Sequence, residues 1–394
     1  MSEEKTTVAI IGAGVAGLAL ANFLLHEQIS CIVLEKRSRA YVEQRQRAGV
    51  IDPWAVRMFR TRGLEERVVG GLPSVPTLNF RIDGESRSLA LDPADHADGR
   101  FCPQRVLLKN LMDAFIADGG DLRFDADVSL DGLVVRSGGR TIDCALIAGC
   151  DGDRGISRAA IPRDHLTRHE HEYGYAWLTI LAEVAPRHQS LMAIHARGFA
   201  GQFARGPQAS RFYLQCPLDS PEWTDEQIWC ELEARFGEPM PRGRIASTQL
   251  VPIRSVVYSP MSYGRLYLLG DAAHIIPPMS AKGMNLALHD ADVFANAVGD
   301  PQRLTNYSDS CLRHVWNYQA YAASWTDLIH DAGDPSYRGE YRHQLARADL
   351  ERLFTSDAAK RLLSQFLAGS LPPYSVPPST GESGDTRATT SVSA

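Results

Sequence analysis

The first forty residues alternate between apolar runs and a helical pattern. Residues 6–11 (TTVAII) are mostly apolar, as expected for a parallel strand that is buried on both faces. Residues 15–26 (VAGLALANFLLH) place apolar side chains at helical spacing, and residues 31–36 (CIVLEK) begin as a second apolar strand. This order of strand, helix and strand predicts a βαβ unit at the start of the chain.

Farther along the chain the pattern predicts a second kind of sheet. Residues 105–118 have helical spacing and stop at a Gly-Gly pair, after which come two strands joined by another Gly-Gly turn. From Tyr173 the sequence changes to alternating segments, such as 175–184 and 211–218, which favour antiparallel strands. After Asp290 the pattern is mostly helical.

A glycine-rich loop joins the first strand to the first helix. Gly12, Gly14 and Gly17 have the GxGxxG spacing, and Glu35 stands at the end of the second strand. In such loops the first glycine makes the tight turn, the second lets a pyrophosphate approach the backbone, and the third lets helix and strand pack closely. The acidic residue accepts hydrogen bonds from a ribose. We therefore predict a dinucleotide site, although the loop alone does not distinguish FAD from NAD.

These patterns predict an α/β fold with a Rossmann-like dinucleotide-binding domain, an inserted antiparallel-sheet substrate domain and a helical C-terminal region. The predicted limits are 1–172 with 261–300, then 173–260, then 301–370. Residues 376–394 are rich in Ser, Thr and Gly and poor in apolar side chains, so burial cannot offset their ordering entropy. We expect them to form a disordered tail.

Composition excludes several classes of function. The 394 residues carry a net charge of −6 with scattered basic residues, so we expect no nucleic-acid partner. No apolar run reaches the roughly 18 residues that a membrane span needs, and the N-terminus lacks a signal-peptide pattern. The seven cysteines contain no CxxC pair, so we expect no metal site and no disulfide framework. A cytoplasmic protein with reduced thiols is the simplest interpretation.

Two further segments follow apolar strands and help to choose the cofactor. Residues 147–158 (IAGCDGDRGISR) turn through Asp151-Gly152 at a strand end. Residues 264–291 contain a strand that ends at Gly270-Asp271, then Pro277-Pro278, then a helix. A helix N-terminus in this segment can face an electron-rich ring system.

Together with the glycine loop, these segments resemble the three fingerprints of class A flavoprotein monooxygenases. The resemblance to the para-hydroxybenzoate hydroxylase-like members spans most of residues 6–374, through pieces such as RAGV (47–50), RFYLQCPL (211–218) and GDAAHIIPPMSAKGMNLA (270–287). It implies FAD as cofactor and NAD(P)H as co-substrate, which agrees with the absence of a second GxGxxG unit. The FAD contacts that it implies are Gly12, Gly14, Gly17, Glu35, Arg47, Gln104, Asp271 and Asn285.

The resemblance also implies a site for an aromatic acid. Arg205 matches the arginine that holds the substrate carboxylate, a task that suits the two-pronged guanidinium. Tyr213 matches a tyrosine that assists it, although a core tyrosine is nearly as good an interpretation. Pro278 matches a proline whose carbonyl lies beside the para substituent. Lys282, before the helix that starts near Gly283, is expected to stabilise developing negative charge.

The co-substrate positions come from the same comparison. Lys36, Arg37, Arg154 and Arg254 are expected to contact NAD(P)H. We lean slightly to NADPH, because cations attract the additional phosphate, but basic residues attract either form. An arginine on a β-rich segment is otherwise usually a solvated residue or part of a surface ion pair.

Two departures from the family bear on the substrate. The family's two relay tyrosines should fall at Met192 and at Leu367, or at Phe366 in a shifted register, and none of these carries a hydroxyl. Phe203 replaces a serine beside the carboxylate-binding arginine. Because a phenol becomes electron-rich when it loses its proton, whereas an amino group donates its lone pair without doing so, we hypothesise an amino-substituted benzoate such as 3-amino-4-hydroxybenzoate.

Other functions stay open at this stage. The nearest alternatives are hydroxylation of 4-hydroxybenzoate itself and an FAD-dependent halogenase or reductase acting on another class of substrate. The chain lacks the WxWxIP-type segment that flavin halogenases need. A non-enzymatic FAD- or NAD-bound sensor has no positive support. The expected partners are a small aromatic carboxylate, O2 and NAD(P)H, and a homodimer is one option.

Overall fold

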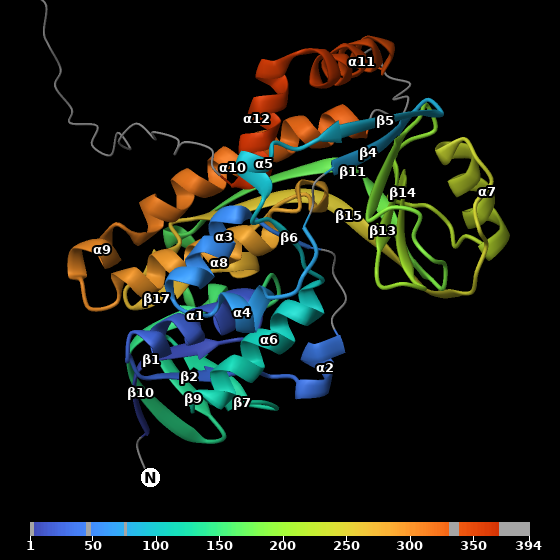
Figure 1. The fold of residues 1–394 in the computed structure, drawn as a ribbon. Coiled ribbons are helices and arrows are strands. Elements are labelled where there is room, and N and C mark those ends of the chain that lie inside the picture. Colours follow the sequence, from blue (N-terminus) through green and yellow to red (C-terminus); the bar gives the residue numbers. More distant parts are fainter. Residues whose placement is uncertain (1–3, 45–48, 75–76, 331–338, 370–394) are drawn as a thin grey trace, which may run out of the picture.

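The computed structural model describes residues 4–44, 49–74, 77–330 and 339–369. Two large mixed sheets dominate these residues, and a group of C-terminal helices lies over the second sheet (Figure 1). The predicted tail at 376–394 lies outside the described residues. Among the helices that are described, none is long and apolar enough to pass through a membrane.

The first sheet is built around the predicted βαβ unit. Its central strands run in the order β17, β10, β1, β2, β7, and each neighbouring pair among them is parallel. Their bounds are β1 Glu4–Ile11, β2 Cys31–Leu34, β7 Asp121–Arg123, β10 Arg140–Gly149 and β17 Leu266–Leu268. The strands β16 (Ser262–Tyr263), β8 (Val128–Asp131) and β9 (Val134–Ser137) complete it. The predicted Rossmann-like arrangement is confirmed.

Three helices pack beside this sheet because each buries a broad apolar face. Helix α1 spans Val15–His26, the predicted range, and ten of its residues are buried. Helix α6 (Gln104–Ala117) lies one residue earlier than predicted, and α8 (Gly283–Ala297) follows the predicted Gly270-Asp271 segment. The three helices and the strands share one apolar core.

The second sheet has the order β18, β15, β11, β14, β13, β12, β4, β5. Its bounds are β4 Thr77–Ile82, β5 Glu85–Ala90, β11 Thr167–Ala182, β12 Ser190–Ile194, β13 Ala200–Ala204, β14 Ser210–Pro217, β15 Ile245–Ser259 and β18 His274–Ile275. The antiparallel strands predicted from Tyr173 onward are present, but the sheet extends beyond 173–260. Strand β4 pairs in parallel with β12, a long-range pairing that local periodicity does not report. The domain limits stay a prediction.

Helices cover the two faces of the second sheet differently. Helix α7 (Asp225–Phe236) packs against one face around Phe212, Leu214 and Leu232. The other face meets the C-terminal helices α10 (Tyr307–Ile329), α11 (Gly339–Thr355) and α12 (Asp357–Ala368). In Figure 1, β11 and β15 run side by side beneath α10, while α7 lies on the outer side of β13 and β14. The expected C-terminal helical region is therefore present.

Short elements complete the fold. They are α2 Arg39–Gln44, α3 Pro53–Thr61, α4 Glu65–Val69, α5 Pro93–His96, α9 Pro301–Thr305, β3 Val50–Ile51 and β6 Arg100–Phe101, with four 3-10 turns at Arg158–Ala160, Arg163–His165, Gly270–Ala272 and Pro278–Ser280. The last two turns belong to the segment between β17 and α8, which passes from the first sheet to the second.

Candidate active site

The glycine loop between β1 and α1 has the geometry of a dinucleotide cradle. Gly12 has a φ of +102°, and a Cβ there would lie 2.6 Å from the carbonyl oxygen of Cys150. A Cβ on Gly17 would lie 2.0 Å from the carbonyl oxygen of Gly12. At Gly14 the nearest atom would be 3.8 Å away, so the protein itself leaves room for a side chain there. Packing of the chain therefore requires a glycine at positions 12 and 17. The open space at Gly14 is what a ligand that approaches the backbone would need.

Two polar residues around this loop also fit a bound dinucleotide. The carboxylate of Glu35 accepts hydrogen bonds from the backbone N–H groups of Ala13 and Arg37, each at 2.8 Å, so it lies beside the glycine loop. Gln104 is buried at the start of α6, and its side-chain oxygen has no hydrogen-bond partner among the described residues. A buried amide oxygen without a partner calls for a ligand or an ordered water. Gly14, Glu35 and Gln104 thus fit a bound dinucleotide, whereas the full set of FAD contacts stays a prediction and Arg47 lies outside the described residues.

A buried ion pair shapes the Gly270-Asp271 loop. One carboxylate oxygen of Asp290 accepts from Gly270 N at 2.9 Å and lies 2.7 Å from His274 Nε2. Burial opposes protonation of His274, but the facing carboxylate raises its pKa above the ordinary value. Burial likewise opposes ionisation of Asp290, yet His274 holds the pKa of that carboxyl below its ordinary value. The sequence does not single out Asp290 as a site residue, and only its contacts with Gly270 and His274 reveal this role.

Asn285 and Lys282 are engaged within the protein. The side-chain amide of Asn285 accepts from Asp52 N at 2.9 Å and donates to Val50 O at 2.8 Å. The Lys282 ammonium is buried and donates to Asp52 at 2.7 Å and to the Leu367 carbonyl at 3.0 Å. Burial raises the pKa of Asp52 to about 6 and lowers that of Lys282. These contacts tie α8, α3 and α12 together, so any direct action of Lys282 on flavin or substrate stays a prediction.

One face of the second sheet collects the predicted substrate residues. Tyr213 is the cross-strand partner of Gly201, which in turn faces Met192, so these side chains share a face. The Tyr213 ring lies 4.7 Å from the ring of Trp177 and 5.5 Å from that of Phe203, measured between centroids. Trp177, which the sequence did not single out, donates to His330 Nε2 at 2.7 Å. The result is an apolar aromatic wall that can pack against a planar ring.

Arg205 lies at the end of β13, next to this wall. Its Nη1 donates to the Ala204 carbonyl at 2.7 Å, while its Nε and Nη2 are buried without a partner among the described residues. Burial lowers the pKa of the guanidinium, and the neighbouring Tyr213 hydroxyl opposes that shift. Nε and Nη2 form the adjacent edge that can hold both oxygens of a carboxylate. A side chain so costly to leave unpaired indicates an anionic ligand.

A cleft of about 270 Å³ reaches Arg205 from the side of α6. It is lined by Pro103, Arg105, Leu181, Ala182, Glu183, Arg205, Ala209 and Ala246. Tyr213, Phe203, Met192 and Pro278 are not among its lining residues, so the cleft approaches the guanidinium from outside the aromatic wall. Because Pro103 and Arg105 flank Gln104, the cleft brings the predicted carboxylate anchor next to a predicted FAD contact.

The Pro278–Ser280 turn connects the Gly270-Asp271 loop, termed the flavin loop, to the aromatic wall. Pro278 is exposed, its carbonyl accepts from Ala281 N at 3.1 Å, and the next residue, Met279, packs in the same cluster as Met192 and Trp177. Leu367, where the family would have a relay tyrosine, is bonded through its carbonyl to Lys282, close to this turn. Met192, Leu367 and Met279, the neighbour of Pro278, belong to one apolar cluster, and neither Met192 nor Leu367 carries a hydroxyl. Their contact with a substrate stays a prediction.

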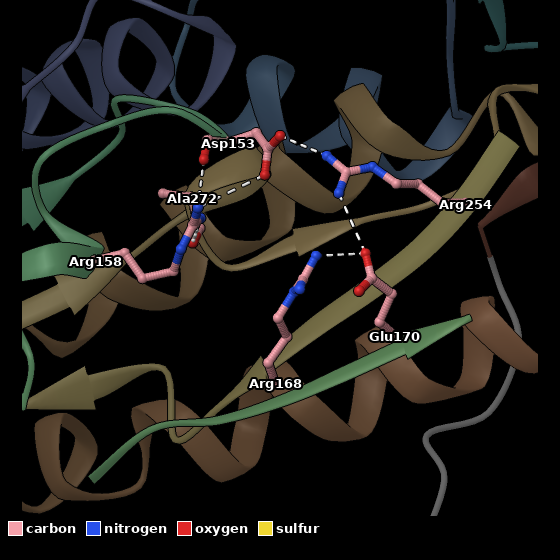
Figure 2. Close-up of polar contacts among 6 residues, drawn as sticks. All are labelled: Asp153, Arg158, Arg168, Glu170, Arg254 and Ala272. Carbon is pink, nitrogen blue, oxygen red and sulfur yellow. Dashed lines mark hydrogen bonds and ion pairs between the residues drawn. The ribbon is translucent and has the colours of Figure 1, made fainter. Parts of the chain in front are cut away.

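Arg254, predicted to bind NAD(P)H, is held by two carboxylates. Its Nη2 lies 2.5 Å from Asp153 and its Nη1 lies 3.3 Å from Glu170, and Arg168 pairs with the same glutamate (Figure 2). Arg158 donates to the Ala272 carbonyl at 2.9 Å. Neither carboxylate was singled out from the sequence. Arg154 and the pair Lys36 and Arg37 are exposed, and the Arg37 guanidinium lies 5.0 Å from the Tyr41 ring centre.

The described residues include one group with the side-chain types of a metal site, although the sequence predicted none. The ligand atoms of His289, Asp290 and Cys311 lie within 4.8 Å of one another. Asp290 already serves His274 and Gly270 through its other oxygen. We therefore interpret the group first as support for the flavin loop.

Comparisons with known proteins agree with this geometry. A family model described as "FAD binding domain" matches residues 5–321. A p-hydroxybenzoate hydroxylase from Acinetobacter baylyi is 32% identical over 401 residues, which cover 95% of this chain and 98% of that relative. The chain belongs to the p-hydroxybenzoate hydroxylase-like class A FAD-dependent aromatic monooxygenases. FAD is therefore its cofactor, and the glycine loop, Glu35 and Gln104 fit it.

More distant matches keep the same fold. A 3-(3-hydroxy-phenyl)propionate/3-hydroxycinnamic acid hydroxylase from Mycobacterium avium is 27% identical over 322 residues, covering 74% of this chain and 54% of that relative. The solved structure of p-nitrophenol 4-monooxygenase from Pseudomonas putida has a TM-score of 0.75 at 18% identity and covers 94% of this chain and 100% of that chain. At that identity the likeness shows the fold alone, so the substrate must be argued from the site.

Proposed function

We propose that this monooxygenase hydroxylates the ring of a small benzoate at the expense of NAD(P)H and O2. The observation that carries the proposal is the Arg205 guanidinium, whose Nε and Nη2 are buried and have no partner within the described part of the chain. A carboxylate of the substrate would satisfy both donors at once. The aromatic wall of Tyr213, Trp177 and Phe203 supplies the matching apolar surface for a ring.

Bound FAD would supply the redox chemistry, in which NAD(P)H provides the two electrons, one atom of O2 is inserted into a ring C–H bond and the other leaves as water. The protein binds and orients the two partners. Arg205 holds the carboxylate end of the substrate, and the ring lies along the aromatic wall with its far end toward the Pro278 turn. The apolar neighbours Met192 and Met279, both buried, keep water from the reacting end.

The side chains at the reacting end favour an amino-substituted ring. Met192 and Leu367 stand where relay hydroxyls would remove the proton of a phenol, and neither can hold or move a proton. An amino group enriches the ring in electrons without a deprotonation step. A substrate such as 3-amino-4-hydroxybenzoate therefore fits this site. The relative named p-hydroxybenzoate hydroxylase supports 4-hydroxybenzoate as the alternative.

The co-substrate is proposed to meet Arg254 and Arg154 near the Asp151–Ser157 turn, with Lys36 and Arg37 at the end of β2 as further cationic contacts. Arg154, Lys36 and Arg37 are exposed. Two cations beside Glu35 favour NADPH slightly over NADH. Comparing kcat/KM for the two nucleotides with one benzoate at saturation measures this preference directly.

A turnover assay tests the function. FAD-loaded enzyme should oxidise NAD(P)H rapidly only when a benzoate is present, and mass spectrometry should find a product with one more oxygen atom. The panel should pair 3-amino-4-hydroxybenzoate and 4-aminobenzoate with 4-hydroxybenzoate, and each with an analogue that lacks the carboxylate. Efficient hydroxylation of 4-hydroxybenzoate with the amino compounds inert would rule out the amino substrate. Equal turnover of the analogues without a carboxylate would rule out the Arg205 anchor.

A further inference from the structure

A continuous chain of charged groups links the long strands of the second sheet to the flavin loop. Glu170 on β11 contacts Arg254 on β15, Arg254 contacts Asp153 in the turn after β10, and Arg158 in the same turn reaches the Ala272 carbonyl (Figure 2). Arg158 also donates to the backbone carbonyl of Asp153 and stacks 4.2 Å from the Tyr258 ring centre. The side chains of the ion-paired groups are only 17% to 30% exposed.

The carboxylates of Asp153 and Glu170 contact the two terminal nitrogens of the Arg254 guanidinium, which could otherwise bind a phosphate. A guanidinium binds an anion strongly when two parallel N–H groups point at it. In this structure Nη2 is 2.5 Å from Asp153 and Nη1 is 3.3 Å from Glu170, so both terminal nitrogens already face carboxylate oxygens. A phosphate that approached this end of the guanidinium would compete with Asp153 and Glu170 for the same two terminal nitrogens.

We propose that Asp153 and Glu170 form an anionic latch on Arg254, which the phosphates of the nicotinamide dinucleotide must displace in order to bind. This inference rests on the proposed function, in which Arg254 contacts NAD(P)H. The latch raises the KM for the nucleotide, because every binding event has to replace two ion pairs. It leaves the substrate anchor at Arg205 untouched, since that guanidinium has no part in the network.

The latch also gives nucleotide binding a route to the flavin loop. When Arg254 leaves Asp153, the turn that carries Asp153 and Arg158 loses an ion pair to β15. In the same turn Arg158 donates a hydrogen bond to the carbonyl of Ala272, one residue after Asp271. Nucleotide binding and the position of the Gly270-Asp271 loop are thus connected through one turn.

Removing the carboxylates one at a time tests the latch. In Asp153→Asn and in Glu170→Gln enzyme, steady-state kinetics with a saturating benzoate should show a KM for NAD(P)H that is lower by about threefold to tenfold, with kcat changed less than twofold. The KM for the benzoate should not change. Wild-type enzyme must turn over in the same assay; if it does not, the proposed function fails before the latch is examined.

Glu172 provides a matched control. It faces Arg254 across the strands in register, is exposed, and forms no ion pair with a described residue. Glu172→Gln removes the same charge from the same region, so it should leave the KM for NAD(P)H within about twofold of wild type if the pairs themselves matter. If all three substitutions lowered the KM for NAD(P)H equally, the cause would be weaker general repulsion between acidic side chains and the nucleotide phosphates. That result would overturn the latch. A higher KM in Asp153→Asn would also overturn it, because the carboxylate would then be holding Arg254 ready for the nucleotide.

Discussion

The two arginines proposed to bind anions, Arg205 and Arg254, differ in how their charge is satisfied. Both residues are half-buried, but the Nε and Nη2 atoms of Arg205 are buried and have no partner among the described residues. Arg254 is partly exposed and holds two carboxylates. Buried guanidinium donors left without a partner are costly, so a ligand that accepts from them contributes a large free energy on binding. A guanidinium that must first give up ion pairs contributes only the difference in free energy between its contacts with the ligand and the ion pairs that it loses. We therefore expect Arg205 to dominate the binding free energy of the benzoate, and Arg254 to change that of the nucleotide by a smaller amount.

The largest effect is expected for Arg205→Met. It removes the anchor but keeps an apolar stem of similar length, so the KM for a benzoate should rise by about 100-fold, equivalent to roughly 3 kcal/mol. The KM for NAD(P)H should stay within twofold. Steady-state kinetics with each component varied in turn measures both. A benzoate KM that rises less than fivefold would mean that the carboxylate binds elsewhere.

The second prediction concerns the pH dependence of folding stability, through His330 behind the aromatic wall. Burial lowers the pKa of His330 to about 3, and this neutral ring accepts the Trp177 hydrogen bond. Because the unfolded chain binds the proton near pH 6.5, stability should be full above that pH. It should fall by up to about 1.4 kcal/mol per pH unit as the pH drops toward 3. Urea unfolding at several pH values measures the slope.

His330→Gln should remove the contribution of one proton to this slope. The remaining slope includes His314, a half-buried residue whose pKa is lowered to about 2 chiefly by desolvation. His188→Gln, at an exposed histidine, is the control and should leave the slope unchanged. An unaltered slope in the His330 variant would show that this ring is not held neutral.

Arg254→Met is expected to have a smaller effect than the change at Arg205. It removes a phosphate contact and also frees two carboxylates, so the KM for NAD(P)H should rise by only about tenfold, or roughly 1.4 kcal/mol. The benzoate KM should not respond. If the nucleotide KM rose as steeply as the benzoate KM does in the Arg205 variant, the two arginines would be energetically equivalent and the comparison would fail.

The smallest effect is expected for Tyr213→Phe. The ring keeps its packing against Trp177 and Phe203, and only the hydroxyl beside Arg205 is lost. The KM for the benzoate should rise by about fivefold, equivalent to roughly 1 kcal/mol for one hydrogen bond. Fluorescence titration of the FAD-loaded enzyme with the same benzoate should give a matching change in Kd. No change in either quantity would assign Tyr213 to the core, the interpretation that the sequence left open.

Much of the site could be predicted because its residues lie within local motifs. The glycine loop and Glu35 are marked by their spacing, and the Gly270-Asp271 turn by its place in a family fingerprint. The structure puts these segments at the ends of parallel strands. Arg205 and Tyr213 depended on resemblance, since nothing local separates them from surface or core residues. The sequence did not single out Trp177, Asp290, Asp153 and Glu170, because their contacts with His330, His274 and Arg254 join separate segments of the chain.

The sequence by itself determined the βαβ unit, the span Val15–His26 of α1 and the turn chemistry at Gly12, because apolar periodicity and glycine conformation are properties of neighbouring residues. Only the tertiary structure decided that β4 and β5 join the second sheet. It alone decided that His274 meets Asp290, and that Arg254 forms ion pairs whereas two donors of Arg205 have no partner among the described residues. The physical reason is that burial and ion pairing depend on which distant segments meet, and Arg254 and Asp153 are separated by 101 residues.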